Sequence, residues 1–256
     1  MKSQINQLKS EAEANYSASR WEDSAKTYEH LVGLAQDNND LEQAIEFAIA
    51  AVRAWKYLLD KEPRINRLYQ AIGIISLKKA ALGFESVAKK AEEDKDLKET
   101  AANYEEAGLG YSLIQSYDKA KSCLESSVKY FEKLSKDAME KKDYETAIHL
   151  FDRISNVYDK ISTLFDKILV DKKDIDEAFK QSLLEEKKNV NKSTYLSKKN
   201  KAFAHEKLAK YYLEMNDSDC KQIAEKEYVN AIKILESIGE SQLAKKLATK
   251  KDKIKC

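Results

Sequence analysis

Glycine and proline are scarce in this chain of 256 residues, which has six glycines and one proline. Average usage would place about 30 of these two residues in a chain of this length. Sandwiches and barrels need many tight turns, and tight turns depend on glycine and proline. A glycine-cradled nucleotide fold is also excluded, because the only close pair, Gly108 and Gly110, lacks a following Gly-Lys-Ser/Thr. The scarcity therefore predicts an all-α protein.

Cysteine is also scarce, and the sequence has neither an excess of charge of one sign nor a long apolar run. Cys123, Cys220 and Cys256 are far apart and odd in number, which argues against a disulfide framework and favours a reducing compartment. Lysine and arginine number 45 against 44 acidic residues, so the basic excess of a nucleic-acid binder is missing. The longest strongly apolar stretches, 47–52 and 71–75, are far shorter than the about 20 residues of a spanning helix. We therefore expect a cytoplasmic protein that binds no nucleic acid.

What the sequence has in abundance is a 3-4 spacing of apolar residues, which is typical of a helix with one buried face. The clearest run begins at Tyr144 and ends at Ile168, and its steps alternate between three and four throughout. Shorter runs with the same steps occupy residues 21–35, 41–58, 117–138 and 224–238. This spacing predicts about ten or eleven helices along the chain.

Short polar breaks between the runs predict helix-to-helix turns, and short connections make neighbouring helices antiparallel. The breaks lie at residues 18–20, 36–40, 115–116, 141–143, 172–174 and 216–218. Carboxylates at these breaks can accept the free amides of a first helical turn, which predicts N-caps at Asp143, Asp174 and Asp217 or Asp219. Pro63 suits the first turn of a helix, where its missing amide costs nothing.

Residues 103–130 place small and large side chains in a particular order over two predicted helices. With no side chain at Gly108 and one methyl group at Ala120, the two backbones can cross closely while aromatic rings fill the surrounding space. This order resembles the tetratricopeptide (TPR) helix-turn-helix pattern. The residues that we expect to pack the repeats are Tyr104, Gly108, Tyr111, Tyr117, Ala120, Leu124, Tyr144, Ala147 and Phe151.

Other stretches match the second helix of that unit, but their spacing is irregular. They lie at residues 21–28, 41–48, 144–151 and 224–231. A regular TPR array repeats every 34 residues or so. The resemblance is therefore to a right-handed TPR-like array of antiparallel hairpins with unequal helices.

Within that class, Ala101, Tyr104, Gly108 and Tyr111, followed by Lys119–Cys123, are similar to the soluble NSF attachment protein (SNAP) family, best over residues 97–165. The resemblance implies a single solenoid over residues 1–256 that serves as an adaptor in vesicle trafficking. As partners it implies the helical bundle of SNARE fusion proteins and an AAA+ ATPase that pulls the bundle apart. Two segments differ from the family: residues 17–21 form a tight turn in place of a membrane-touching loop, and the C-terminal segment is rich in lysine instead of acidic.

The residues that usually carry catalysis are dispersed. His205 and Glu206 begin like a zinc-protease motif, but Ala209 stands where the second histidine would be. Cys123 and Cys220 lie at or beside apolar positions, which favours small core residues over nucleophiles. We therefore predict no enzymatic activity, no cofactor and no metal. The alternative is an enzyme or small-molecule binder with a deep polar pocket inside a helical fold.

A protein-binding scaffold is the interpretation that the sequence favours, because solenoids bind partners on a long concave face. One class of TPR proteins binds the C-terminal carboxylate of a peptide with Lys and Asn on the first helix of a repeat. In the best-matched repeat of this chain those positions hold Ala102, Glu105, Glu106 and Leu109, and acids there would repel a peptide carboxylate. Contacts with an acidic helical bundle or extended helix are predicted at Lys187, Lys188, Lys198, Lys199, Lys250 and Lys251.

Two lysine-rich segments have few apolar anchors. Residues 185–201 carry six lysines and are predicted to form a loop or joint, and residues 245–256 are predicted to form a disordered basic tail. Six lysines beside Cys256 would give this tail a weak attraction to anionic lipid. Two other functions therefore stay open, a TPR interaction module unrelated to fusion and a peripheral membrane protein bound through its tail.

Overall fold

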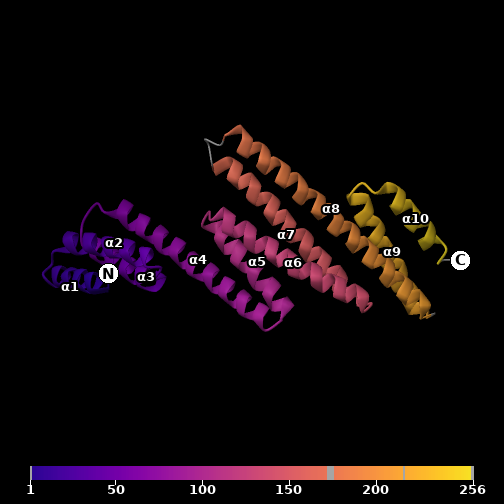
Figure 1. Cartoon of the computed structure of the whole chain (residues 1–256), viewed down its shortest axis with the longest axis horizontal. Coiled ribbons are helices and arrows are strands. Elements are labelled where there is room, and N and C mark those ends of the chain that lie inside the picture. Colours follow the sequence, from indigo (N-terminus) through magenta and orange to yellow (C-terminus); the bar gives the residue numbers. More distant parts are fainter. Residues whose placement is uncertain (1, 172–175, 216, 255–256) are drawn as a thin grey trace. The chain divides into compact units, whose positions relative to one another are not determined.

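The computed structural model describes residues 2–171, 176–215 and 217–254, and every regular element in these ranges is an α-helix. The all-α class predicted from the scarcity of glycine and proline is confirmed. None of the helices described is long and apolar enough to span a membrane. The helices of these ranges (Figure 1) are α1 (Lys2–Ser17), α2 (Trp21–Asp37), α3 (Leu41–Trp55), α4 (Glu62–Glu93), α5 (Leu97–Leu113), α6 (Tyr117–Glu140), α7 (Tyr144–Asp171), α8 (Glu177–Glu214), α9 (Ser218–Ser237) and α10 (Ser241–Asp252).

The chain divides into two compact units. Unit 1 comprises Met1–Gly83 and Leu113–Ser116, and unit 2 comprises Phe84–Ser112 and Tyr117–Cys256. That one continuous array runs through all the helices stays a prediction.

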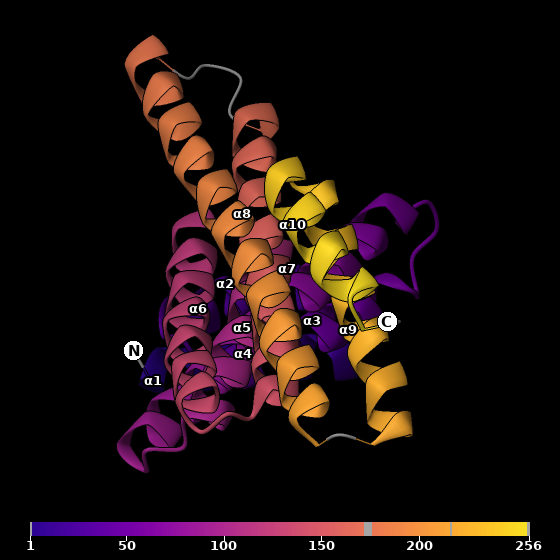
Figure 2. The same cartoon turned by 90° about the vertical axis from the view of Figure 1, so that its right-hand side faces the viewer.

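Each unit has its own apolar core. In unit 1, α1, α2 and α3 fold back on one another around Leu31, Phe47 and Trp55, and the unit 1 part of α4 adds Ile75. In unit 2, α7 and α8 lie side by side as long rods, and α9 and α10 continue the layer next to α8 (Figures 1 and 2). The 3-4 stripe of α7 is buried along its length, from Ala147 through Ile161 to Ile168.

Several chain reversals share one backbone geometry. Between α6 and α7, Lys142 adopts a positive φ of 59°, its N–H donates to the Met139 carbonyl, and the Asp143 N–H donates to the Ala138 carbonyl at 2.8 Å. These two bonds satisfy carbonyls that the end of a helix leaves free. The same pair of bonds recurs around Ser19, Asn39, Lys95 and Gly239. A single left-handed residue thus reverses the chain without a long loop.

An aspartate follows three of these turns and caps the next helix. The carboxylates of Asp40, Asp96 and Asp143 accept the backbone amides of residues 43, 99 and 146 at 3.1, 2.9 and 3.1 Å. Each aspartate stands five residues after a buried alanine, namely Ala35, Ala91 and Ala138. The alanine lets the helices approach, and the aspartate starts the next helix.

The predicted boundaries are largely confirmed. Turns occur at 18–20, 38–40, 114–116 and 141–143, and Pro63 lies in the first turn of α4. The cap at Asp143 is confirmed, and the Asp217 side chain accepts the Asp219 amide at 3.1 Å. The break at 172–174 with Asp174, and residue 216, lie outside the described residues. The turns at 94–96 and 238–240 were not predicted from the sequence.

The prediction of a loop or joint at residues 185–201 is wrong, because these residues lie inside α8. Their buried side is made of small polar residues instead of large apolar ones. The hydroxyl of Ser197 donates to the Phe151 carbonyl of α7 at 2.8 Å, and that of Thr194 donates to the Val190 carbonyl at 3.2 Å. A hydroxyl satisfied in this way can be buried without large cost. The lysines keep their charges at the edges of the contact, where Lys201 pairs with Asp152 at 2.6 Å.

The prediction of a disordered tail over residues 245–256 is also wrong for the part that the structure describes. Residues 241–252 form α10, whose Ala244 and Leu247 are buried against α8 and α9. The two side chains are three residues apart and therefore lie on the same face of the helix. Lys255 and Cys256 lie outside the described residues.

Candidate functional site

The close approach of α5 and α6 predicted from Gly108 and Ala120 is present. A Cβ atom added at Gly108 would lie 2.7 Å from Leu124 Cγ and 3.1 Å from the Ala120 carbonyl oxygen. Real Cβ atoms do not approach other atoms so closely, so this crossing requires glycine. Ala120 and Leu124 are both fully buried there.

The aromatic residues expected around this crossing surround it at different depths. Tyr111 is buried, and its hydroxyl donates to Glu85 of α4 at 2.6 Å. Tyr104 is half-buried and stacks on Tyr130 with ring centroids 6.1 Å apart. Tyr117 is half-buried and donates to Asp171 of α7. Among the other residues expected to pack the repeats, Ala147 and Phe151 are buried and Tyr144 is half-buried.

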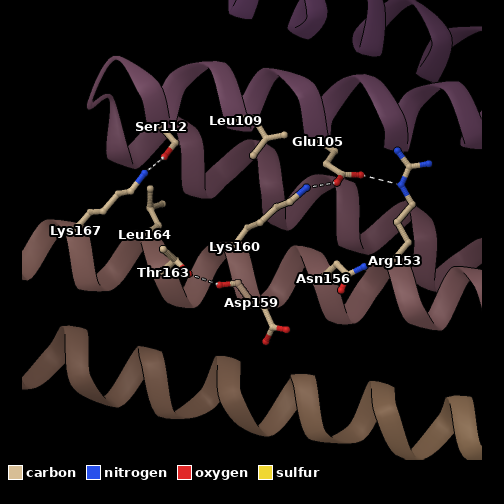
Figure 3. A pocket seen from close by; sticks show the side chains of 10 residues that line it. All are labelled: Glu105, Leu109, Ser112, Arg153, Asn156, Asp159, Lys160, Thr163, Leu164 and Lys167. Carbon is tan, nitrogen blue, oxygen red and sulfur yellow. Dashed lines mark hydrogen bonds and ion pairs between the residues drawn. The ribbon is translucent and has the colours of Figure 1, made fainter.

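An open groove of about 620 Å³ lies between α5 and α7 (Figure 3). Helix α5 contributes one wall with Glu105, Leu109 and Ser112. Helix α7 contributes the other with Arg153, Asn156, Asp159, Lys160, Thr163, Leu164 and Lys167. Glu105 and Leu109 were expected on the concave face, and both line the groove. Glu106, expected there too, is exposed and is not part of its lining.

Glu105 is the buried charge of the groove, with 8% of its side chain exposed. It accepts hydrogen bonds from Arg153 Nε at 2.8 Å and from Lys160 Nζ at 2.5 Å. The guanidinium of Arg153 also lies over the Phe131 ring, 4.6 Å from its centroid. A carboxylate can be buried at tolerable cost when two cations donate to it. This three-residue cluster ties α5 to α7 at one end of the groove.

One cation of the groove lies outside this cluster. Lys167 is exposed, and its Nζ lies 3.4 Å from the Ser112 hydroxyl at the other end of the groove. The carboxylate of Asp159 points away from α5 in Figure 3. The cations Arg153, Lys160 and Lys167 therefore face a groove whose one buried acid is already neutralised. This arrangement favours an acidic segment over a basic one.

The lysines that the sequence predicted as partner contacts are mostly engaged within unit 2. Lys187 pairs with Asp166 of α7, Lys199 with Glu240 at 2.6 Å, and Lys250 with Glu206 at 2.8 Å. Lys251 lies 3.9 Å from its neighbour Asp252. Lys188 and Lys198 make no ion pair with any residue that the structure describes. The fold therefore does not gather these six lysines into one basic surface.

Sequence reading missed the groove residues of α7, although they carry a signal of their own. Arg153, Asn156, Lys160, Thr163 and Lys167 follow the same 3-4-3-4 spacing as the apolar stripe of that helix. Residues with this spacing share one helix face. A polar face opposite a buried one is the usual pattern of a surface helix, so the spacing groups these residues on one face but does not by itself mark them as a site.

The residues considered for catalysis are distributed among packing contacts. His205 is 8% exposed, and its Nδ1 contacts Glu227 of α9, while Glu206 accepts from Lys210 and Lys250. Burial raises the pKa of the Cys123 thiol to about 11. In the ranges 2–171, 176–215 and 217–254, no group of three or more His, Cys, Asp or Glu residues could hold a metal ion.

Comparison with known proteins gives a distant structural likeness. No family model matches the chain, and neither does any curated protein. Among solved structures, the chain is similar to BtubC (BKLC) from P. vanneervenii, with 13% identity and a TM-score of 0.30, over 99% of this chain and 89% of that chain. A TM-score this low carries no argument about fold or function. The function is therefore argued from the groove.

Proposed function

We propose that this protein is a non-catalytic scaffold, a right-handed TPR-like array similar to the SNAP family, which binds another protein in the groove between α5 and α7. The partner is an acidic helical bundle or extended helix, of the kind that SNARE fusion proteins form. In this role the protein acts as an adaptor in vesicle trafficking, and an AAA+ ATPase is a second partner.

The recurring turn supports the array. Five αL turns, three of them followed by an aspartate cap, reverse the chain within a few residues, so the helices that they join pack as hairpins. The Gly108 crossing supplies the close approach that a TPR unit has between its two helices. Helix pairs stacked in this way leave an extended face along one set of helices.

The observation that carries the proposal is the groove with its three inward-facing cations. Its volume of about 620 Å³ is enough for a row of side chains from a bound segment. Its lining places Leu109 among long charged side chains, which suits the polar and apolar faces of a helix. An acidic helix would place a carboxylate beside Lys167, the cation that Glu105 does not hold, while its apolar residues contact Leu109.

A direct binding measurement tests the proposal. A purified, acidic SNARE-type helical bundle is labelled and titrated with the full chain, and Kd is read by fluorescence anisotropy at low and high salt. We expect binding that weakens as salt rises, because the contact is electrostatic. The substitution Lys167→Glu, which leaves the Glu105 cluster intact, is expected to weaken binding about fivefold or more.

The matched control is Lys136→Glu, which makes the same change in net charge on an exposed lysine of α6. Its Kd should stay close to that of the unaltered protein. Equal losses in both variants, or no binding of the bundle, would contradict the proposal. Equally tight binding of an unrelated acidic helix would favour the generic TPR module unrelated to fusion.

A further inference from the structure

The connection between α3 and α4, residues 56–61, exposes more apolar surface than any comparable described turn. Leu59 is 89% exposed and Tyr57 is 60% exposed, the former the highest value among the large hydrophobic residues described. Leu58 turns inward instead and packs against the core of unit 1. The backbone is held in place, because the amides of Tyr57 and Leu58 donate to the carbonyls of Ala54 and Trp55. The apolar tip is therefore a built feature of the turn.

Aromatic rings support this tip from the side of the α1–α2 turn. Tyr57 stacks on Trp21 with ring centroids 4.2 Å apart, and Tyr16 meets both rings edge-on. Tyrosine and tryptophan combine an apolar body with a polar end, which suits a boundary between water and a less polar phase. The cluster holds Tyr57 in place while Leu59 projects beyond it.

Cations surround the tip. Residues 53–67 contain Arg53, Lys56, Lys61, Arg64 and Arg67 against two acids, Asp60 and Glu62. Lys61 and Arg64 lie over the Trp55 ring, 5.8 and 4.7 Å from its centroid. They also face Glu22 of α2, whose pKa is lowered chiefly by its hydrogen bond with Lys26 and further by these two charges. Glu29 is a further acid beside them, because it accepts a hydrogen bond from Trp55 Nε1 at 2.5 Å. With Lys26, which pairs with Glu22 at 3.0 Å, six cations stand against four acids, an excess of two positive charges.

We propose that the α3–α4 turn is a membrane-contact site, in which Leu59 and Tyr57 enter an anionic lipid bilayer while the surrounding lysines and arginines meet its headgroups. A protruding apolar tip suits a bilayer, whereas a bound peptide requires a groove or a pocket. The excess of cations selects an anionic surface. This site is separate from the groove between α5 and α7 and from the basic segment at 245–256, and it stands whether or not the groove binds a protein.

Vesicle flotation of the full chain tests the site. The probes are vesicles of phosphatidylcholine alone and vesicles that also contain phosphatidylserine. We expect the protein to float with the second kind and to stay behind with the first. Leu59→Asp should lower the partition coefficient at least about tenfold, because it removes a leucine from the bilayer and adds a repelled charge. Val170→Asp, at another aliphatic residue that is 73% exposed, is the control and should bind as before.

Reversing pairs of lysines at two places distinguishes binding through this turn from a general attraction of the whole protein to anionic lipid. Lys56→Glu with Lys61→Glu should weaken binding at least about twenty-five-fold, at about fivefold for each cation lost. Lys188→Glu with Lys198→Glu makes the same change in net charge on α8 and should have little effect. Similar losses in both pairs, or loss only when Lys245 and Lys246 are replaced, would overturn the proposal.

Fluorescence gives a readout of position. Of the two tryptophans, Trp55 is fully buried and Trp21 lies beside Tyr57. Lipids brominated on their acyl chains should quench Trp21 in the unaltered protein and not in Leu59→Asp, whose melting curve is measured to show that it is folded. Absence of quenching would overturn the proposal. So would a dimer in light scattering that Leu59→Asp dissociates, because the tip would then be an interface between copies.

Discussion

Gly108 of α5 and Cys123 of α6 are both buried, and the properties of each follow from how little room surrounds it. The missing side chain of Gly108 leaves just enough space for Leu124 and the Ala120 carbonyl. Cys123 is 6% exposed on the same helix as these two residues. The effect of replacing Gly108 and the reactivity of the Cys123 thiol therefore both depend on the atoms that immediately surround each residue.

Replacing Gly108 by alanine tests the crossing. We expect Gly108→Ala to lower the free energy of unfolding by about 1–3 kcal/mol, because the added methyl group displaces Leu124 or the backbone of α6. Thermal and urea unfolding measure the change. Combining it with Leu124→Ala should give less destabilisation than the sum of the two single changes, since the smaller residue vacates the space.

Two other helical glycines are matched controls. At Gly33 and Gly73 an added Cβ atom would meet nothing within 4 Å. Gly33→Ala and Gly73→Ala are therefore expected to stabilise the protein by about 0.5–1 kcal/mol, the usual gain in helix propensity. Stabilisation by Gly108→Ala of the same size would show that the two backbones do not approach closely.

Cys123 should resist alkylation in the folded protein. Its pKa of about 11 means that about one thiol in a thousand is ionised at pH 8, and the thiol is buried as well. Iodoacetamide followed by peptide mass spectrometry should modify Cys220, which is half-exposed, and leave Cys123 unmodified until a denaturant is added. Rapid modification of both residues in the native protein would contradict the burial of Cys123.

At the scale of elements, polar contacts between helices decide which faces meet. Glu105 of α5 bonds to two residues of α7 that are 48 and 55 positions away. Ser197 of α8 bonds to the backbone of α7 across 46 positions. Such contacts set the rotation and register of one helix against another, because the apolar stripes alone allow several registers.

Glu105→Gln tests the link between α5 and α7. We expect it to lower the free energy of unfolding by about 1–2 kcal/mol, since charged hydrogen bonds are lost and the half-exposed cations are screened by water. Urea unfolding measures the loss. The control is Glu106→Gln at the exposed neighbouring position, which should change stability by less than about 0.5 kcal/mol. Equal effects of both substitutions would contradict the buried cluster.

At the scale of the molecule, charge is nearly balanced, with a formal net charge of +1, and many tyrosine hydroxyls donate to carboxylates. Tyr130 donates to Glu92, and Tyr117 donates to Asp171. Burial and then this hydrogen bond raise the pKa of Tyr130 to about 12, and the hydrogen bond with Asp171 raises that of Tyr117 to about 12. Both link one helix to another within unit 2.

These raised pKa values predict a loss of stability in alkali. A group whose pKa is raised by folding stabilises the protein fully below its unfolded pKa, near 10, and loses that contribution as the pH rises towards its folded pKa. We therefore expect the free energy of unfolding to fall from about pH 10 to about pH 12. Tyrosine absorbance should show ionisation at higher pH in the native protein than in denaturant. Coincident titration curves would contradict these contacts.

Helix type and most turns could be predicted from the sequence, because each depends on residues within one or two helical turns of each other. The Gly108 crossing could be predicted because a short turn joins its two helices and makes them neighbours. An alanine followed five residues later by an aspartate, at positions 35, 91 and 138, is also a local pattern, and it would have predicted the turn at 94–96. In the same way, the polar face of α7 is a local pattern that the apolar stripe obscured.

The packing of residues 185–201 and the pairing of the lysines depended on distant residues. Residues 185–201 pack as part of α8, where Ser197 donates to the backbone of α7, a contact that no local spacing reveals. Lys187, Lys199 and Lys250 looked available to a partner until folding placed an acid beside each of them. Amphipathic spacing specifies which face of a helix is buried, whereas the neighbour of a charged side chain is set by how helices far apart in the chain rotate and slide against one another.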